Sequence, residues 1–292
     1  MKITRSTAAP HGNRRRPSRR TRLICTAVLV AGATALTPVA FGAASTPAAP
    51  SALPSSCTAS ANGRAVFNDG FEGSAENFNF VKHRYDGAEA GSSITAATSP
   101  ALAGKQSGRF TVPGDGKSWR AEVANDAMGY GAYRFSFANY LPADWERTNF
   151  DTIVAQWHGK PLSDGSNTNP PIALSVRNSE WLLSVFHLEN PTDTEPVRRE
   201  YRLGTVSLGK WNNWTFDIDW STADHAGALR VCRDGRQLVN DSGENNFHQP
   251  KEPYFKVGIY RPSWNPAKGR DFPIGVSVAT VHIDSVTVTD LD

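Results

Sequence analysis

Short stretches in which hydrophobic and polar residues alternate run along most of this chain, separated by glycine, proline, asparagine and aspartate. Such alternation is typical of β-strands that are buried on one face, and long stretches with helical periodicity are absent. Asp234-Gly235 lies between two alternating runs and predicts a hairpin. The pattern therefore predicts an all-β sandwich or barrel. Its expected strands are Arg64–Asn68, Ser107–Val112, Tyr133–Tyr140, Thr152–His158, Ile172–Arg177, Trp181–Leu188, Trp214–Trp220, Ala228–Arg233, Tyr254–Tyr260 and Thr280–Thr289.

The N-terminal region has the layout of an export signal. A basic run ends at Arg22, and an apolar stretch over 23–36 and then small residues follow it. We therefore expect a cleaved signal peptide over 1–44, and the general secretory and twin-arginine routes both stay open. The apolar stretch is too short to span a membrane. Residues 45–60 read as a Pro/Ala/Ser-rich linker and 61–292 as one domain, which we expect to be a secreted monomer.

Charge is distributed unevenly along the chain. The 292 residues carry a formal net charge of +3, but eight of the 31 basic residues lie in the first 44 positions, which hold no acid. The remainder therefore has 23 basic and 28 acidic side chains. A basic patch of the kind that binds nucleic acid is not expected in the domain, so an anionic ligand would have to be met by locally placed cations.

Two of the three cysteines remain after removal of the predicted signal, because Cys25 lies within it. Cys57 and Cys232 are then a natural disulfide pair in an exported protein, and the alternative is two separate thiols. A bond between them would tie the N-terminal arm to the domain.

Three segments each present polar side chains on one face of a strand. Residues at positions i and i+2 share a face, so each segment can bury its apolar face and expose chemically capable groups on the other. The polar set is Arg120 and Glu122, Gln156 and His158, and Tyr254, Lys256 and Tyr260. Each strand alone has a structural explanation, such as a surface ion pair for Arg120 and Glu122, but the three together predict a site.

The opposite faces of these segments are expected to lie in the core. By alternation, Ile153, Ala155 and Trp157 share one such face, and Phe255, Val257 and Ile259 share another. Gly258 falls on the polar side, where we expect it to leave room for a ligand to approach the backbone.

In their order, the motifs Arg-x-Glu, Gln-x-His and Tyr-x-Lys-x-Gly-x-Tyr resemble those of jelly-roll polysaccharide lyases, including alginate lyases. The segments at 67–72, 156–159, 254–261 and 283–286 are similar to the heparin-lyase-I-like and glucuronan-lyase branch. Asn125 and Arg261 depart from the alginate-lyase pattern, which weakens an assignment to alginate. The resemblance implies a concanavalin-like β-jelly roll with a concave substrate cleft.

The resemblance also implies an activity, the β-elimination that cleaves an acidic polysaccharide beside a uronate. This reaction removes the C5 proton and breaks the C4–O bond, so the uronate carboxylate must be neutralised by preorganised donors. We expect Arg120 and Gln156 to bind the carboxylate. His158 either completes this clamp or acts as the base, and Tyr260 transfers a proton beside the scissile bond. The expected substrate-binding residues are Lys256, Glu122, Tyr254 and Arg177.

Two other functions are compatible with the same sandwich. A non-catalytic glycan-binding module would keep the aromatic residues and lose the Arg–Gln–His–Tyr set, which is intact here. A jelly-roll glycoside hydrolase needs two placed carboxylates, and the only close pair on one strand face is Asp217 and Asp219. No cofactor is required for elimination, although Glu72 and Asp284 are candidates for a structural calcium site.

Overall fold

The computed structural model describes residues 53–80, 82–84, 91–126, 128–159, 169–190, 192–222, 224–249, 253–265 and 278–292. The predicted signal peptide, 1–44, and the first half of the predicted linker lie outside these residues. The compact unit Thr46–Asp292 contains every element described below. No helix in the described part of the chain is long and apolar enough to cross a membrane.

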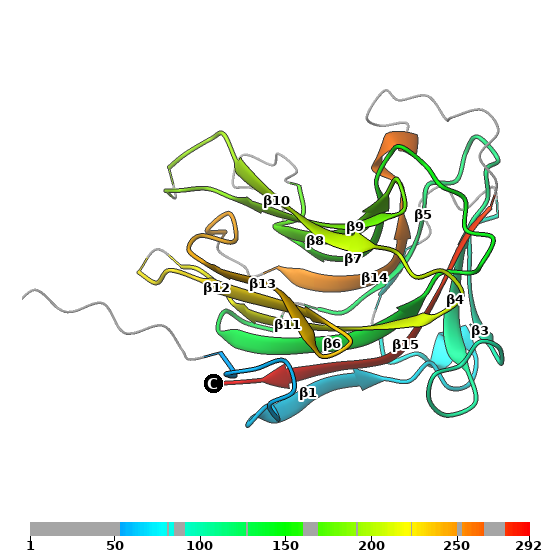
Figure 1. Ribbon diagram of the computed structural model, residues 1–292, viewed down its shortest axis with the longest axis horizontal. Helices are drawn as coiled ribbons and strands as arrows, with labels where there is room; N and C mark the ends of the chain where they lie inside the picture. Colours follow the sequence, from blue (N-terminus) through cyan, green and yellow to red (C-terminus); the bar gives the residue numbers. More distant parts are fainter. Residues whose placement is uncertain are drawn as a thin grey trace, which may run out of the picture. The chain divides into compact units, whose positions relative to one another are not determined.

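Two antiparallel sheets stack on one another in this unit (Figure 1). The eight-stranded sheet has the order β13-β12-β11-β6-β15-β4-β3, and β1 pairs with β15. Its strands are β1 Arg64–Asp69, β3 Ser93–Ala97, β4 Ser107–Val112, β6 Ala132–Tyr140, β11 Trp211–Asp219, β12 Ala228–Arg233, β13 Arg236–Ser242 and β15 Ala279–Asp290.

The seven-stranded sheet has the order β10-β9-β8-β7-β14-β5-β2. Its strands are β2 Lys82–Arg84, β5 Arg120–Ala124, β7 Thr152–His158, β8 Ile172–Arg177, β9 Glu180–His187, β10 Val197–Thr205 and β14 Tyr254–Tyr260. The described residues also contain short 3-10 turns at Ala75–Asn77 and Pro262–Trp264. This architecture confirms the predicted all-β jelly-roll sandwich.

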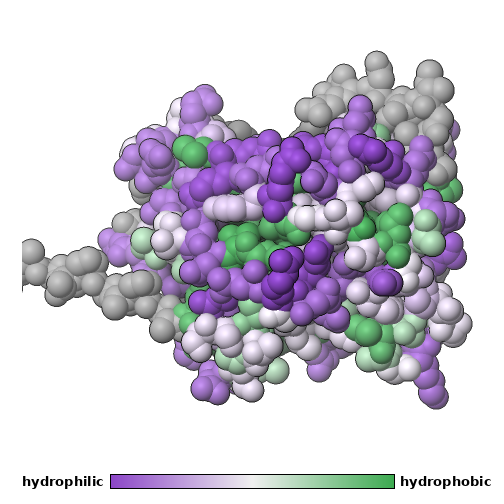
Figure 2. Space-filling model, viewed as in Figure 1, coloured by the Kyte–Doolittle hydropathy of each residue, from purple (hydrophilic) through white to green (hydrophobic). Residues whose placement is uncertain are grey.

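The core lies between the sheets and is rich in aromatic rings. Trp157 on the seven-stranded sheet contacts Phe216 on the other sheet, with ring centroids 4.7 Å apart, and its neighbour Phe255 at 5.0 Å. Figure 2, in the same view, shows hydrophobic residues between two bands of hydrophilic ones. Burial of one face of each strand explains the period-two pattern of the sequence.

All ten expected strands are present, most with ends within one or two residues of those predicted. The expectation missed β2, β3 and β10, which lie at sheet edges. β10 illustrates the reason, because its sequence is VRREYRLGT and only Leu203 is buried. An edge strand most of whose side chains face solvent carries little hydrophobic signal.

The predicted hairpin and disulfide are both confirmed. Asp234 and Gly235 have positive φ values of 51° and 75°, and they join β12 to β13. Cys57 is bonded to Cys232 on β12, with a Cα–Cα distance of 5.9 Å. Arg134 Nη1 also donates to the carbonyl oxygen of Ala59 at 2.5 Å, which holds the N-terminal arm against the same sheet.

Replacing Cys57 and Cys232 together with serine should lower the free energy of unfolding by about 2–5 kcal/mol. The bond closes a loop with a sequence separation of 175, so its loss gives the unfolded chain much more conformational freedom. Denaturant unfolding of the oxidised protein and the double variant measures the difference. Equal unfolding midpoints and slopes would show that the disulfide adds nothing to stability.

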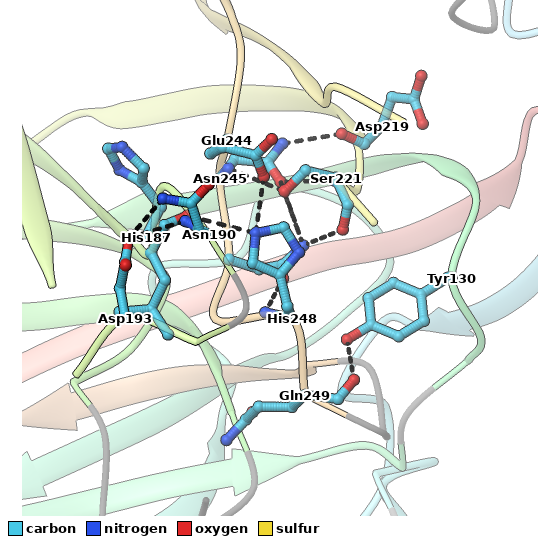
Figure 3. Close-up of polar contacts among 12 residues, drawn as sticks. Tyr130, His187, Asn190, Asp193, Asp219, Ser221, Glu244, Asn245, His248 and Gln249 are labelled. Carbon is cyan, nitrogen blue, oxygen red and sulfur yellow. Dashed lines mark hydrogen bonds and ion pairs between the residues drawn. The ribbon is translucent and has the colours of Figure 1, made fainter. Parts of the chain in front are cut away.

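Buried polar contacts hold the segment that leads from β13 towards β14. Asn245 Oδ1 accepts from the backbone amide of Ser221 at 2.9 Å, and Asn245 Nδ2 donates to the carbonyl oxygen of Asp219 at 2.8 Å. His248 Nε2 lies 2.9 Å from Glu244 Oε2 (Figure 3). The chain is thus fixed at the end of β11 shortly before it enters β14, which carries three of the expected site residues.

Candidate active site

The sheet order places the three expected site strands side by side, with β14 between β7 and β5. Lys256 pairs with Gln156 on β7 and with Ala124 on β5. At one end of β14, Tyr254 pairs with His158, and at the other end Tyr260 pairs with Arg120. The structure therefore brings all seven expected polar residues onto neighbouring strands, a grouping that alternation within single strands could not establish.

Glu122 is the centre of this group and is only 1% exposed. Its Oε1 accepts a hydrogen bond from Gln156 Nε2 at 2.5 Å, and its Oε2 lies 2.6 Å from Lys256 Nζ and 3.0 Å from Arg120 Nε. Gln156 is 0% exposed and Lys256 1% exposed. Glu122, Gln156 and Lys256 thus form a buried polar layer, whose expected contacts with substrate stay predictions.

Arg120 and Tyr260 are in direct contact beside that layer. The Arg120 guanidinium carbon lies 4.0 Å from the centre of the Tyr260 ring, a cation–π arrangement. The Arg120 side chain is 13% exposed, so Glu122 fixes its Nε side while part of it reaches the surface. Asn265 Nδ2 donates to the Tyr260 hydroxyl at 3.4 Å.

His158 is neutral at neutral pH and has one unprotonated nitrogen. Its Nδ1 lies 2.7 Å from the carbonyl oxygen of Gly159, which can only accept, so Nδ1 carries the hydrogen and Nε2 the lone pair. Burial lowers the pKa of His158 to about 4, and the positive charge of Lys256 acts in the same direction. The Tyr254 ring lies 5.7 Å from the imidazole. His158 Nε2 can therefore accept a proton or a hydrogen bond.

The pKa of His158 predicts how stability changes with pH. Between the ordinary value of 6.5 and about 4, the unfolded chain binds a proton that folded His158 excludes, so stability falls as the pH falls through this window. His158→Gln should flatten that dependence, leaving the parts due to His282, whose pKa burial also lowers to about 4, and to His187, whose pKa burial lowers as well. Denaturant unfolding across the window tests this, and an unchanged slope in the variant would contradict it.

One expectation about side-chain direction is wrong. Ile153 was expected to share the core face of Ala155 and Trp157, but it packs with Tyr260 and Ala173 in a cluster separate from the main core. The pairing of β7 with β8 shifts between Ile153 and Ala155, and this irregularity turns Ile153 to the other face.

Gly258 does not leave room for a ligand as expected. Its φ is 136°, and a Cβ atom there would lie 2.2 Å from the carbonyl oxygen of Ala121 and 2.8 Å from the Glu122 Cα. Glycine is required because β5 approaches closely at an irregular point of β14. The residue therefore sets the position of Glu122 beside β14.

Arg177 lies away from the seven polar residues on β5, β7 and β14, which we call the central group. Ala173 is the partner of Gln156 on β8, and Arg177 is four residues further along that strand, roughly 13 Å away. Arg177 pairs with Glu200 at 2.9 Å and lines a cavity of about 380 Å³ together with Arg147 and Arg202. Strand alternation could not identify these two arginines, because Arg147 lies in a loop and Arg202 lies on β10, which the sequence did not predict.

The cleft over the central group stays a prediction, since residues 160–168 and 266–277, which follow β7 and the 3-10 turn after β14, lie outside the described residues. Within the described residues, sequence reasoning missed Asn265, which contacts the Tyr260 hydroxyl. It also did not foresee that Arg261 is buried, with its guanidinium carbon 4.2 Å from the Trp264 ring centre. Burial lowers the pKa of Arg261 to about 10. Neither contact follows from strand alternation.

The remaining acidic candidates are engaged in structural contacts. Glu72 Oε1 accepts from the amide of Lys105 at 2.7 Å, and Asp284 Oδ2 accepts from that of Leu102 at 2.8 Å. In the described part of the chain, no group of three or more His, Cys, Asp and Glu side chains could hold a metal ion, and the calcium site stays a prediction. Asp217 is 0% exposed and paired with Arg134 at 2.6 Å, which does not suit a glycosidase carboxylate.

Solved structures that align with this chain include polysaccharide lyases. The endo-β-1,4-glucuronan lyase of the fungus Trichoderma reesei aligns with a TM-score of 0.64 at 18% identity, covering 77% of this chain and 95% of that one. Alginate lyase AlyC3 aligns at 0.44 and 16% identity, covering 64% of this chain and 76% of that one. Family 7 alginate lyase A1-II′ aligns at 0.45 and 16% identity, covering 67% and 83%.

No curated protein sequence matches the chain. The family model described as polysaccharide lyase matches residues 70–287, about three quarters of the sequence. This span contains all seven polar residues of the central group and the whole of β5, β7 and β14. The chain therefore belongs to the polysaccharide lyase family.

Proposed function

We propose that this lyase cleaves a glucuronan-like polyuronate within the chain by β-elimination, and that it acts outside the cell as a monomer. One observation carries the proposed chemistry: a guanidinium, a neutral imidazole and a tyrosine hydroxyl belong to adjacent strands around one buried carboxylate. The disulfide supports an oxidising compartment. The choice of substrate is supported by a solved structure of similar fold, which is described as an endo-β-1,4-glucuronan lyase.

Arg120 is the group that we assign to the uronate carboxylate. A guanidinium can bind a carboxylate through two parallel hydrogen bonds, and Glu122 already fixes the Nε side of Arg120. Gln156 donates one amide hydrogen to Glu122 and has a second one that can bind the uronate carboxylate. Among the described residues, Gln156 Oε1 has no hydrogen-bond partner, and a sugar hydroxyl would supply the donor that this buried atom lacks.

Proton transfer is assigned to His158 and Tyr260. Neutralising the carboxylate makes the C5 proton more acidic, and donors around the developing charge stabilise the enolate-like intermediate. His158 Nε2 has the lone pair that a base requires. Tyr260 can serve as base, as the acid that protonates the departing O4, or as both. The relative orientation of C5–H and C4–O in the substrate decides between the two residues.

A panel of uronate polymers tests the proposal. The purified protein is incubated with glucuronan, alginate, hyaluronan and heparin, and ultraviolet absorbance follows the unsaturated product. We expect the largest initial rate on glucuronan, with a rapid fall in viscosity that reports internal cleavage. Faster cleavage of heparin would overturn the substrate assignment, and binding without any product would favour a glycan-binding module.

A further inference from the structure

A row of side chains crosses the face of the eight-stranded sheet that is turned away from the core. Successive pairing partners place Thr95 on β3 beside Arg109 on β4, His282 on β15, Tyr140 on β6 and Trp211 on β11. The row thus spans five neighbouring strands. At the ordinary strand spacing it is about 19 Å long, and it runs across the strands rather than along them.

These side chains point outward because their chain neighbours fill the core. Val281 and Ile283, which flank His282, are 0% exposed, as is Phe110 next to Arg109. The rings in the row contact one another: Tyr140 and Trp211 are 5.6 Å apart between centroids, and Tyr140 meets His282 edge-on at 6.0 Å. The row is therefore an ordered surface that combines aromatic rings with a cation.

A cavity of about 500 Å³ lies over one end of this row. It is lined by Arg109, Thr280 and His282 from the strands and by Ser99, Asp144 and Trp145 from loops. Its volume is in the range of small-ligand sites. Hydroxyl, carboxylate, imidazole and guanidinium groups next to an indole are a lining suited to a sugar ring with a charged substituent.

His282 contributes a hydrogen-bond acceptor to this cavity. The Ser107 hydroxyl donates to the carbonyl oxygen of Pro100 at 2.7 Å, so it can only accept from His282 Nδ1 at 3.2 Å. The hydrogen of the neutral imidazole is therefore on Nδ1, and Nε2 carries the lone pair. Arg109 is exposed and forms no ion pair within the described residues. One positively charged hydrogen-bond donor, the Arg109 guanidinium, and several hydrogen-bond acceptors therefore line the same cavity.

We infer that this face is a second, non-catalytic binding site for an acidic polysaccharide chain. Arg109 takes a uronate carboxylate, while His282, Thr280 and Asp144 take hydroxyl groups. Tyr140 and Trp211 stack against sugar rings further along the row. The identity of the sugar as a uronate rests on the proposed function. The site lies on the opposite sheet from Arg120, so it retains polymer without taking part in elimination.

Affinity electrophoresis in gels containing glucuronan tests this site on a His158→Ala/Tyr260→Phe background, in which the polymer is expected to stay intact. Adding Arg109→Gln or Trp211→Ala should raise the apparent dissociation constant about tenfold. Arg236→Gln, an exposed arginine on β13 of the same sheet, is the matched control. Thermal unfolding confirms that each variant is folded, and Trp211→Phe replaces Trp211→Ala if the latter is not.

The outcomes separate the second site from the proposed function. Retardation unchanged in both Arg109→Gln and Trp211→Ala would overturn the inference, even when the wild-type protein forms unsaturated product. Retardation reduced in these variants supports the site, even when no polymer is cleaved. Equal retardation in gels of neutral dextran would overturn its assignment to an acidic chain.

Discussion

Replacing Tyr260 with phenylalanine is expected to lower kcat by about 10²- to 10⁴-fold, the usual contribution of a placed proton-transfer group. The change removes one hydroxyl and keeps the ring that packs against Ile153 and Ala173 and receives the Arg120 guanidinium. KM should change little, because the hydroxyl acts on the scissile bond rather than on binding. Initial rates of unsaturated-product formation on glucuronan measure both quantities.

Tyr201→Phe is the matched control for this change. Tyr201 lies on β10, and its hydroxyl donates to Asp241 at 2.8 Å, away from the central group. The control should keep wild-type kcat, and both variants should unfold at temperatures close to that of the parent. Full activity in Tyr260→Phe would remove Tyr260 from the reaction and leave proton transfer to His158 alone.

Replacing Glu122 with glutamine is expected to cost about 3–5 kcal/mol of folding stability, because it removes the carboxylate that lies 2.6 Å from the buried Lys256 ammonium. The same change removes the group that fixes Arg120 at 3.0 Å. Any folded fraction should therefore show a raised KM and a lowered kcat together. Denaturant unfolding and steady-state kinetics measure the two effects.

Two further variants show whether burial is the cause. Glu200→Gln breaks partly exposed ion pairs with Arg177 and Arg198, and each pair of this kind contributes only about 0–1 kcal/mol. Glu122→Gln combined with Lys256→Met removes both buried charges and should regain most of the lost stability. A double variant no more stable than Glu122→Gln would show that the ammonium is not what destabilises the single variant.

Strand alternation could predict the sandwich because most strands bury one face. Phe255, Val257 and Ile259 are all in the core as expected. Alternation fails where the inward face of a strand carries few hydrophobic residues, as in β10, in which only Leu203 is buried, or where pairing shifts, as at Ile153. A register shift of this kind depends on the neighbouring strand, so it cannot be predicted from the sequence of a single strand.

The members of the site could be predicted, but their division into layers could not. Arg120, Gln156, His158 and Tyr260 were grouped by face and by motif, and the strand order brings them together. Gln156 is fully buried whereas Arg120 is partly exposed, and this difference depends on how the strands pack around Glu122. The expectation that Gly258 leaves room for a ligand is wrong for the same reason, because the close approach of β5 is set by the packing of the sheet.

Mass spectrometry of the products formed from purified glucuronan tests the central claim most directly. Elimination leaves an unsaturated uronate at the new non-reducing end, so each oligosaccharide is one water molecule lighter than the corresponding hydrolysis product. We predict a series of unsaturated oligosaccharides with the wild-type protein and none with His158→Ala/Tyr260→Phe. A series of saturated, hydrated oligosaccharides would contradict the assignment of elimination to this site.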